Sequence, residues 1–178
     1  MTGLPAEFLG YARASGPAGV RNHLVILSVC GLNAPQARKL GAALPHAVLI
    51  STDYGRGQVG EDKDFHARML KAFGTHPNTG AVIVLAADAA MRTQYQDAIE
   101  ATNRPCAGFS LQEEDEDAEA MLAAATQAGR DLGAALDRQP RVPCPVTDLF
   151  VAMECGHSDA SSGIMANPLV GDVADAIG

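Results

Sequence analysis

Short apolar runs rich in β-branched residues alternate with segments whose apolar residues recur at helical spacing, and this alternation restricts the fold more than any other feature. Strands are predicted at residues 23–29, 46–51, 80–87, 106–111 and 148–154. Helices are predicted at residues 33–44, 61–73, 88–101 and 117–136, with Asn33 as a possible N-cap of the first. Strands that alternate with helices form parallel sheets through right-handed βαβ crossovers. We therefore predict an α/β fold: a doubly wound, mostly parallel sheet of about five strands in a Rossmann- or flavodoxin-like three-layer sandwich.

The length of 178 residues is enough for one well-buried domain, and we treat residues 1–178 as a single α/β domain. Aromatic residues make up only 4% of the chain, so the core must be built from Ala, Val, Leu and Ile. At the end of the chain, residues 165–178 read as a loop that opens an amphipathic helix. We expect this segment to lead into a missing domain, which makes the chain an N-terminal fragment of a longer large subunit.

The formal net charge of −8 offers no basic stripe for phosphates and argues against a nucleic-acid partner. No apolar run approaches the roughly 20 residues that span a bilayer, so no membrane association is expected. The 4 cysteines show no CxxC spacing and no secretory signal precedes them. Reduced thiols in a cytoplasmic protein are the simplest interpretation.

The most reactive set of side chains lies at residues 155–168, directly after the last predicted strand. Cys155 and Asp159 are candidate metal ligands, and Asp159 is also a candidate catalytic residue. Ser158, Ser162 and Asn167 offer hydroxyl and amide groups for substrate binding. In α/β folds, ligands lie beyond the carboxyl ends of the strands, which favours a site here. An ordinary strand-to-helix turn with an N-cap remains the alternative.

A second candidate segment, residues 54–60, follows the second predicted strand. It surrounds Arg56 and Gln58 with three glycines, and its amides and guanidinium can hold an anion. The spacing is not GxGxxG, so we expect neither a nicotinamide nor a flavin cofactor. Asp88, at the end of the third predicted strand, is placed either to face the crevice as a metal ligand or to cap the next helix.

Two further segments are less informative. Arg21 and Asn22 precede the first predicted strand, where Arg21 could bind a carboxylate or equally stabilise a helix end or the sheet edge. The acidic run at residues 113–117 precedes a predicted helix, and we interpret it as a solvated N-terminal turn.

Four parts of the sequence are informative together: Gly10-Tyr11 with Gly19-Val20-Arg21-Asn22, the Tyr54-Gly55-Arg56 loop with Gln58, His76-Pro77-Asn78, and residues 155–168. Taken in order, they resemble the altronate/galactarate dehydratase (UxaA) family. The resemblance covers essentially the whole chain, and the motif at 155–168 is its most specific part. Within that family, the Tyr54-Gly55-Arg56 loop and residues 105–109 look most like those of (2R)-sulfolactate sulfo-lyase large subunits.

The resemblance implies a lyase that removes water or sulfite from a small 2-hydroxy acid through an enolate, with a divalent metal such as iron(II) or manganese(II). It also implies a small subunit or fused small domain, a further C-terminal domain and an isolated fragment that is inactive. We expect a homo-oligomer as well.

The mechanistic hypothesis gives Arg56 the substrate carboxylate or sulfonate and Arg21 a second anion contact, with Asn22, Tyr54 and Gln58 beside them. Cys155, Asp159 and Asp88 are the expected metal ligands, and the base is left to the missing domain.

Two departures from the family pattern bear on the substrate. Ser51 and Arg56 stand where sugar-acid dehydratases show His and Cys, and Ala87-Asp88-Ala89 stands where they show Gly-Cys-Glu. Loss of such ligands changes metal affinity and puts aldarate dehydration in doubt. A non-catalytic module that binds an anionic metabolite is the competing hypothesis.

Overall fold

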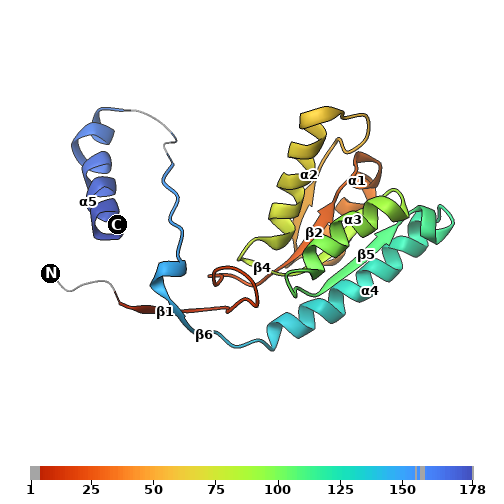
Figure 1. Cartoon of the computed structure of the whole chain (residues 1–178), viewed down its shortest axis with the longest axis horizontal. Helices are drawn as coiled ribbons and strands as arrows, with labels where there is room; N and C mark the ends of the chain where they lie inside the picture. Colours follow the sequence, from red (N-terminus) through yellow and green to blue (C-terminus); the bar gives the residue numbers. More distant parts are fainter. Residues whose placement is uncertain (1–4, 155, 157–158, 178) are drawn as a thin grey trace.

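The computed structural model describes residues 5–154, 156 and 159–177, and Figure 1 shows the arrangement of the elements. The strands are β1 Glu7–Gly10, β2 His23–Ser28, β3 Val48–Ser51, β4 Thr79–Ala86, β5 Cys106–Ser110 and β6 Val142–Pro145. The α-helices are α1 Ala34–Ala43, α2 Gly60–Thr75, α3 Ala89–Glu100, α4 Ala118–Asp137 and α5 Asn167–Ile177. Short 3₁₀ turns occupy Gly31–Asn33, Gln112–Glu114 and Val146–Asp148, and a π-helical turn spans Ser162–Ala166.

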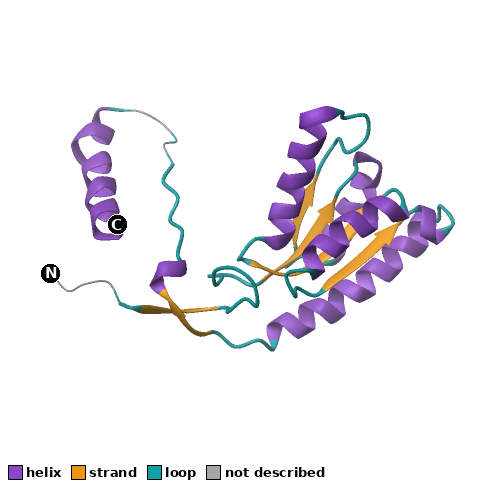
Figure 2. Ribbon diagram, in the orientation of Figure 1, coloured by secondary structure: helices purple, strands orange, loops and turns teal. Residues whose placement is uncertain are grey.

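The central sheet is parallel and has 4 strands in the order β3-β2-β4-β5. Helices cover both of its faces, as Figure 2 shows, which confirms the predicted doubly wound three-layer sandwich. The predicted strands at 23–29, 46–51, 80–87 and 106–111 correspond to β2, β3, β4 and β5.

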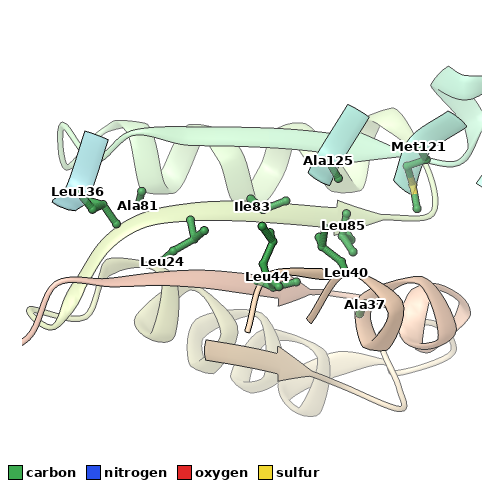
Figure 3. Close-up of a cluster of buried hydrophobic side chains, with 11 residues drawn as sticks. Leu24, Ala37, Leu40, Leu44, Ala81, Ile83, Leu85, Met121, Ala125 and Leu136 are labelled. Atoms are coloured by element: carbon green, nitrogen blue, oxygen red, sulfur yellow. The ribbon is translucent and has the colours of Figure 1, made fainter. Parts of the chain in front are cut away.

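The core is divided into two layers by the alternation of side chains along the strands. Leu24 and Ile26 of β2 pack with residues of α1 and α4 on one face, a cluster that Figure 3 shows. Val25 and Leu27 point to the other face and pack with residues of α2 and α3. β4 is buried along its whole length, as expected for a central strand between two helical layers.

The prediction of a fifth parallel strand at residues 148–154 is wrong. Instead, β6 pairs antiparallel with β1, and this two-stranded ribbon runs away from the parallel sheet (Figure 1). The ribbon redirects the chain before the apolar run begins, so the run has no strand to pair with. Phe150, in the middle of that run, is 95% exposed.

Asn33 occupies the N-cap position of α1, as suggested, but its side chain does not cap the helix. Asn33 is completely buried and makes no side-chain cap hydrogen bond; its Nδ2 donates instead to the carbonyl oxygen of Ala86 at 3.1 Å. The amide therefore joins the start of α1 to the end of β4.

The C-terminal arm, residues 149–177, includes the expected helix, because α5 begins at Asn167. Figure 1 shows α5 on the far side of the β1–β6 ribbon from the sheet. A search of the described residues found no helix with the length and apolar character needed to cross a bilayer.

Candidate functional site

The strand order places a switch point between β2 and β4, because the chain moves from β2 to β3 on one side and then to β4 on the other. In open α/β sheets, ligands bind beyond the carboxyl ends of the strands at such a point. The loop after β3 also reaches this edge, since the backbone N–H of Gly31 donates to the carbonyl oxygen of Tyr54 at 2.7 Å. Three loops therefore meet at the edge where a ligand is expected.

Arg56 and Asp88 come together at this edge. The Nη2 atom of Arg56 lies 3.3 Å from Oδ2 of Asp88, and their side chains are 58% and 30% exposed. Asp88 also caps α3, because its Oδ1 accepts the backbone N–H of Met91 at 2.8 Å. The capping alternative for Asp88 is therefore confirmed, while the outer part of the Arg56 guanidinium remains accessible.

The glycine-rich loop that carries Arg56 is fixed against the end of β2. Gly55 has a φ of +104°, and a Cβ atom there would overlap the carbonyl oxygen of Val29, so only glycine fits without displacement. The Thr52 hydroxyl accepts the backbone N–H of Tyr54 at 3.1 Å. The Tyr54 side chain is 68% exposed, and Gln58 is partly buried nearby in sequence.

A second polar group, which was not predicted from the sequence, lies at the end of β5. Glu113 receives two hydrogen bonds from Arg92, from Nε at 2.8 Å and from Nη2 at 3.0 Å, and a further one from the Ser110 hydroxyl. Its hydrogen bonds with Arg92 and Ser110 hold the pKa of Glu113 below its usual range. Glu113 is thus an organised part of this edge and not a freely solvated member of the acidic run.

The structure does not bring Arg21 and Asn22 to Arg56. Both precede β2 and lie at the amino edge of the sheet, one strand length from the loops described above. The Oδ1 atom of Asn22 accepts from Arg13, and its Nδ2 donates to Gln139 at 2.9 Å. These bonds give Asn22 a structural role at the amino edge.

Asp159 is the residue of the C-terminal loop whose geometry is best defined. Its Oδ1 accepts the backbone N–H groups of Ser161 at 2.7 Å and Ser162 at 3.1 Å, as an N-cap does. Hydrogen bonds from the Ser161 side chain, and then from these two backbone groups, lower the pKa of Asp159. Ser162 and Asn167 line a hollow of about 400 Å³ on the arm, together with Met153, Glu154 and Val170. Cys155 and Ser158 lie outside the described residues.

Figure 1 shows the arm that carries Asp159 apart from the carboxyl edge of the sheet. Within the described part of the chain, Arg56 and Asp88 therefore share one place, and Asp159, Ser162 and Asn167 share another.

The described residues do not by themselves fit a metal ion. Among them, no three His, Cys, Asp or Glu side chains converge on one position. The Oδ1 atom of Asn33 is buried at the switch point without a described hydrogen-bond partner, but a single amide oxygen is not a metal site. What the carboxyl edge offers is an accessible guanidinium that can bind a carboxylate or sulfonate.

Comparison with protein families gives two matches along the chain. Residues 10–136 match the family described as D-galactarate dehydratase/altronate hydrolase, second domain. Residues 146–178 match the family described as D-galactarate/altronate dehydratase, C-terminal. The interval between the two matches, residues 137–145, contains the whole of β6, where the chain leaves the α/β body.

Three curated relatives are similar over nearly the whole chain. The (2R)-sulfolactate sulfo-lyase subunit beta of Chromohalobacter salexigens is 34% identical over 94% of this chain and 43% of its own length. The altronate dehydratases of Bacillus subtilis and Escherichia coli are each 30% identical, over 94% and 93% of this chain and 36% and 35% of their own lengths. The chain thus spans less than half the length of these relatives. No solved structure matches it significantly.

Proposed function

The chain belongs to the D-galactarate dehydratase/altronate hydrolase family, and on that basis we propose that it is part of a carbon–oxygen or carbon–sulfur lyase acting on a small 2-hydroxy acid. The observation that carries the proposal is the match to this family along residues 10–136 and 146–178. The accessible Arg56 at the sheet's switch point supports it, because the substrate class is anionic.

The proposed reaction is an elimination. A base removes the proton from the carbon that carries the carboxylate, and that electron pair forms a double bond to the neighbouring carbon. The leaving group then departs from the neighbouring carbon with the electrons of the bond that joined them. It leaves as water, once its hydroxyl has been protonated, or as sulfite, when it is a sulfonate. The enol product then tautomerises to a 2-oxo acid. The demanding species is the enolate dianion, which requires positive charge or hydrogen-bond donors close to the carboxylate.

In this proposal, Arg56 binds the substrate carboxylate or sulfonate, and Asp88 holds the guanidinium in place until the substrate arrives. Tyr54 and Gln58 flank the same loop and contact the bound anion. The residues at 155–168 supply the remaining polar contacts, with Asp159 acting in catalysis. Because Asp159 and Arg56 lie apart in this chain, the proposal requires the complete assembly to bring them together.

A divalent metal, iron(II) or manganese(II), remains part of the proposal for the complete protein. Cys155, Asp159 and Asp88 are the proposed ligands. Since the described residues do not form a metal site, we derive no step through the ion.

The relative from Chromohalobacter salexigens is named as a subunit beta. We propose that this chain likewise works with a small subunit or fused small domain, as a homo-oligomer in the cytoplasm. We also propose that residues 1–178 are the N-terminal part of a longer large subunit. The match of residues 146–178 to the C-terminal family supports an arm that leads into a further domain.

The test is to express the complete reading frame that contains this chain with its candidate small subunit, supply ferrous or manganous ion, and measure 2-oxo acid formation. Sulfolactate and sugar acids are offered in parallel, with released sulfite measured as a second product. We expect Arg56→Ala to lower kcat/KM by about tenfold or more, because a charged hydrogen bond to the substrate is lost.

Arg68→Ala is the matched control, since Arg68 is an exposed arginine on α2, away from the switch point. The proposal fails if no 2-hydroxy acid is converted. The role of Arg56 fails if its variant and the Arg68 variant turn over equally well.

A non-catalytic anion-binding module is the second candidate. This function is favoured because both carboxylate oxygens of Asp88 already have partners. One caps α3 and the other pairs with Arg56, so Asp88 has no oxygen left without a partner for a metal ion. Saturable binding of a 2-hydroxy acid without any product would support this function.

A further inference from the structure

A pair of arginines, Arg13 and Arg104, lies at the amino edge of the sheet, away from the loops of the proposed function. Both side chains line one small hollow beside the start of β4. Arg104 is 6% exposed, and Arg13 is partly buried. A buried guanidinium usually pairs with a carboxylate, so its partners are informative.

Arg13 is held by neutral acceptors. Its Nε donates to the carbonyl oxygen of Pro77 at 2.7 Å, and its Nη2 donates to that of Arg21 at 3.0 Å. Its Nη1 donates to Oδ1 of Asn22 at 2.9 Å.

Arg104 is held in the same manner. Its Nε donates to the carbonyl oxygen of Thr79 at 3.1 Å, and its Nη2 donates to that of His76 at 3.3 Å. Its Nη1 donates to the Thr102 hydroxyl at 2.7 Å. A guanidinium has five N–H donors, so each arginine retains N–H groups beyond those that fix its position.

The two positive charges are not compensated within the described chain. The ion pairs found there join Arg56 to Asp88 and Arg92 to Glu113, and neither involves this pair. Burial lowers the pKa of Arg13, and the neighbouring Arg104 cation lowers it further. Two like charges held together with neutral acceptors cost free energy, which a bound anion would offset.

The hollow between the arginines has a volume of about 120 Å³, and Thr102, Asn103 and Gln139 also line it. Sites for drug-sized ligands measure roughly 300–1,000 Å³, so a nucleotide does not fit. One carboxylate, sulfate or phosphate group matches both the charge and the size.

We propose that this hollow is an anion-binding site, in which Arg13 and Arg104 jointly bind one carboxylate or tetrahedral oxyanion. The shared chemistry has two sources: a free metabolite or ion, and an acidic side chain of a partner subunit. The site is separate from the carboxyl edge, and anion binding there does not depend on the lyase proposal. Only the experiment that distinguishes the two sources uses the small subunit of the proposed function.

The first experiment titrates the chain with sodium sulfate, phosphate and acetate at an ionic strength held constant with potassium chloride. Binding is followed by calorimetry and by the chemical shifts of the arginine Nε–H groups. We expect saturable binding of at least one of these anions. Arg13→Lys keeps the charge but loses the planar fork, and it should weaken binding by about tenfold. Arg68→Lys makes the same change on α2 and should leave binding unchanged.

Circular dichroism first establishes that each variant is folded. This control matters most for Arg104→Gln, because Arg104 also donates to backbone carbonyl oxygens, and weaker binding by that variant could reflect unfolding. If the occupant is a free anion, sulfate binding persists after the small subunit is added. If it is a partner's carboxylate, the subunit and sulfate compete. Absence of saturable binding to the chain, or binding that Arg13→Lys and Arg68→Lys affect equally, overturns the proposal.

Discussion

Arg56 and Asp88 form an ion pair that passes over the carboxyl end of β2, with 3.3 Å between Nη2 and Oδ2. The pair spans β2 because Arg56 follows β3, Asp88 follows β4, and these strands flank β2 in the sheet. It therefore joins the loop after β3 to the loop after β4, across the end of β2. The same carboxylate caps α3, so one residue fixes both the helix start and the guanidinium.

This double role can be separated by substitution. Asp88→Ala removes the cap and the ion pair and should lower the free energy of unfolding by about 1 kcal/mol. Asp88→Asn keeps an oxygen for the Met91 N–H and should cost less than about 0.5 kcal/mol, because the exposed pair contributes little. Urea unfolding followed by circular dichroism measures both values. Equal losses in the two variants would show that the ion pair, not the cap, provides the stability.

Gly129 of α4 is buried and faces side chains of the core. A Cβ atom at this position would overlap Cδ1 of Leu44 and lie 2.9 Å from Cδ1 of Ile83, and both side chains are buried. Gly129→Ala should therefore destabilise the protein by about 1–3 kcal/mol, although alanine favours helices.

The control is Gly133→Ala, one helical turn later, where a Cβ atom meets nothing within 4 Å. This variant should gain about 0.5–1 kcal/mol from helix propensity. Thermal unfolding of the two variants gives opposite shifts in Tm if the packing argument is correct. A stabilised Gly129→Ala variant would contradict it.

The Cys106 thiol should be unreactive in the folded protein. Burial, and then the Glu100 carboxylate, raise the pKa of Cys106 to about 12. At pH 8 the thiolate fraction is then about one in ten thousand. Iodoacetamide labelling followed by mass spectrometry should modify Cys106 far more slowly in the native chain than in urea. Similar rates in the two conditions would exclude the raised pKa.

The parallel sheet could be predicted from the sequence because its four strands are short apolar runs that alternate with segments of helical periodicity. The run at residues 148–154 has a similar composition, but the prediction of a strand there was wrong. Composition does not reveal the reason. A strand needs a partner, and the preceding residues pair with β1, which is more than 130 residues away in the chain. The antiparallel ribbon then carries the run away from the sheet.

The candidate site was predicted only in part for a similar reason. Arg56 and Asp88 each follow a strand, so their meeting at the carboxyl edge follows from parallel topology. Arg21 precedes a strand, and the same rule places it at the opposite edge. Glu113 was hidden within an acidic run, and only the position of Arg92 on α3 shows that its charge is paired.

The Glu113 pair predicts a specific dependence of stability on pH. Its folded-state pKa lies below the unfolded carboxyl value of about 4.3, so the stabilisation is present above that pH and is lost as the pH falls through the folded value. Glu113→Gln should therefore reduce the free energy of unfolding at pH 6 by less than about 1 kcal/mol, since the pair is partly exposed. The difference from the parent chain should shrink as the pH is lowered from 6 to 3.

The control is Asp115→Asn, which removes one charge from the same acidic run and should not reproduce this pattern. Asp115 has a left-handed backbone conformation, which asparagine tolerates. Urea unfolding across this pH range measures both variants, and a Glu113→Gln difference that stays constant with pH would exclude the lowered pKa.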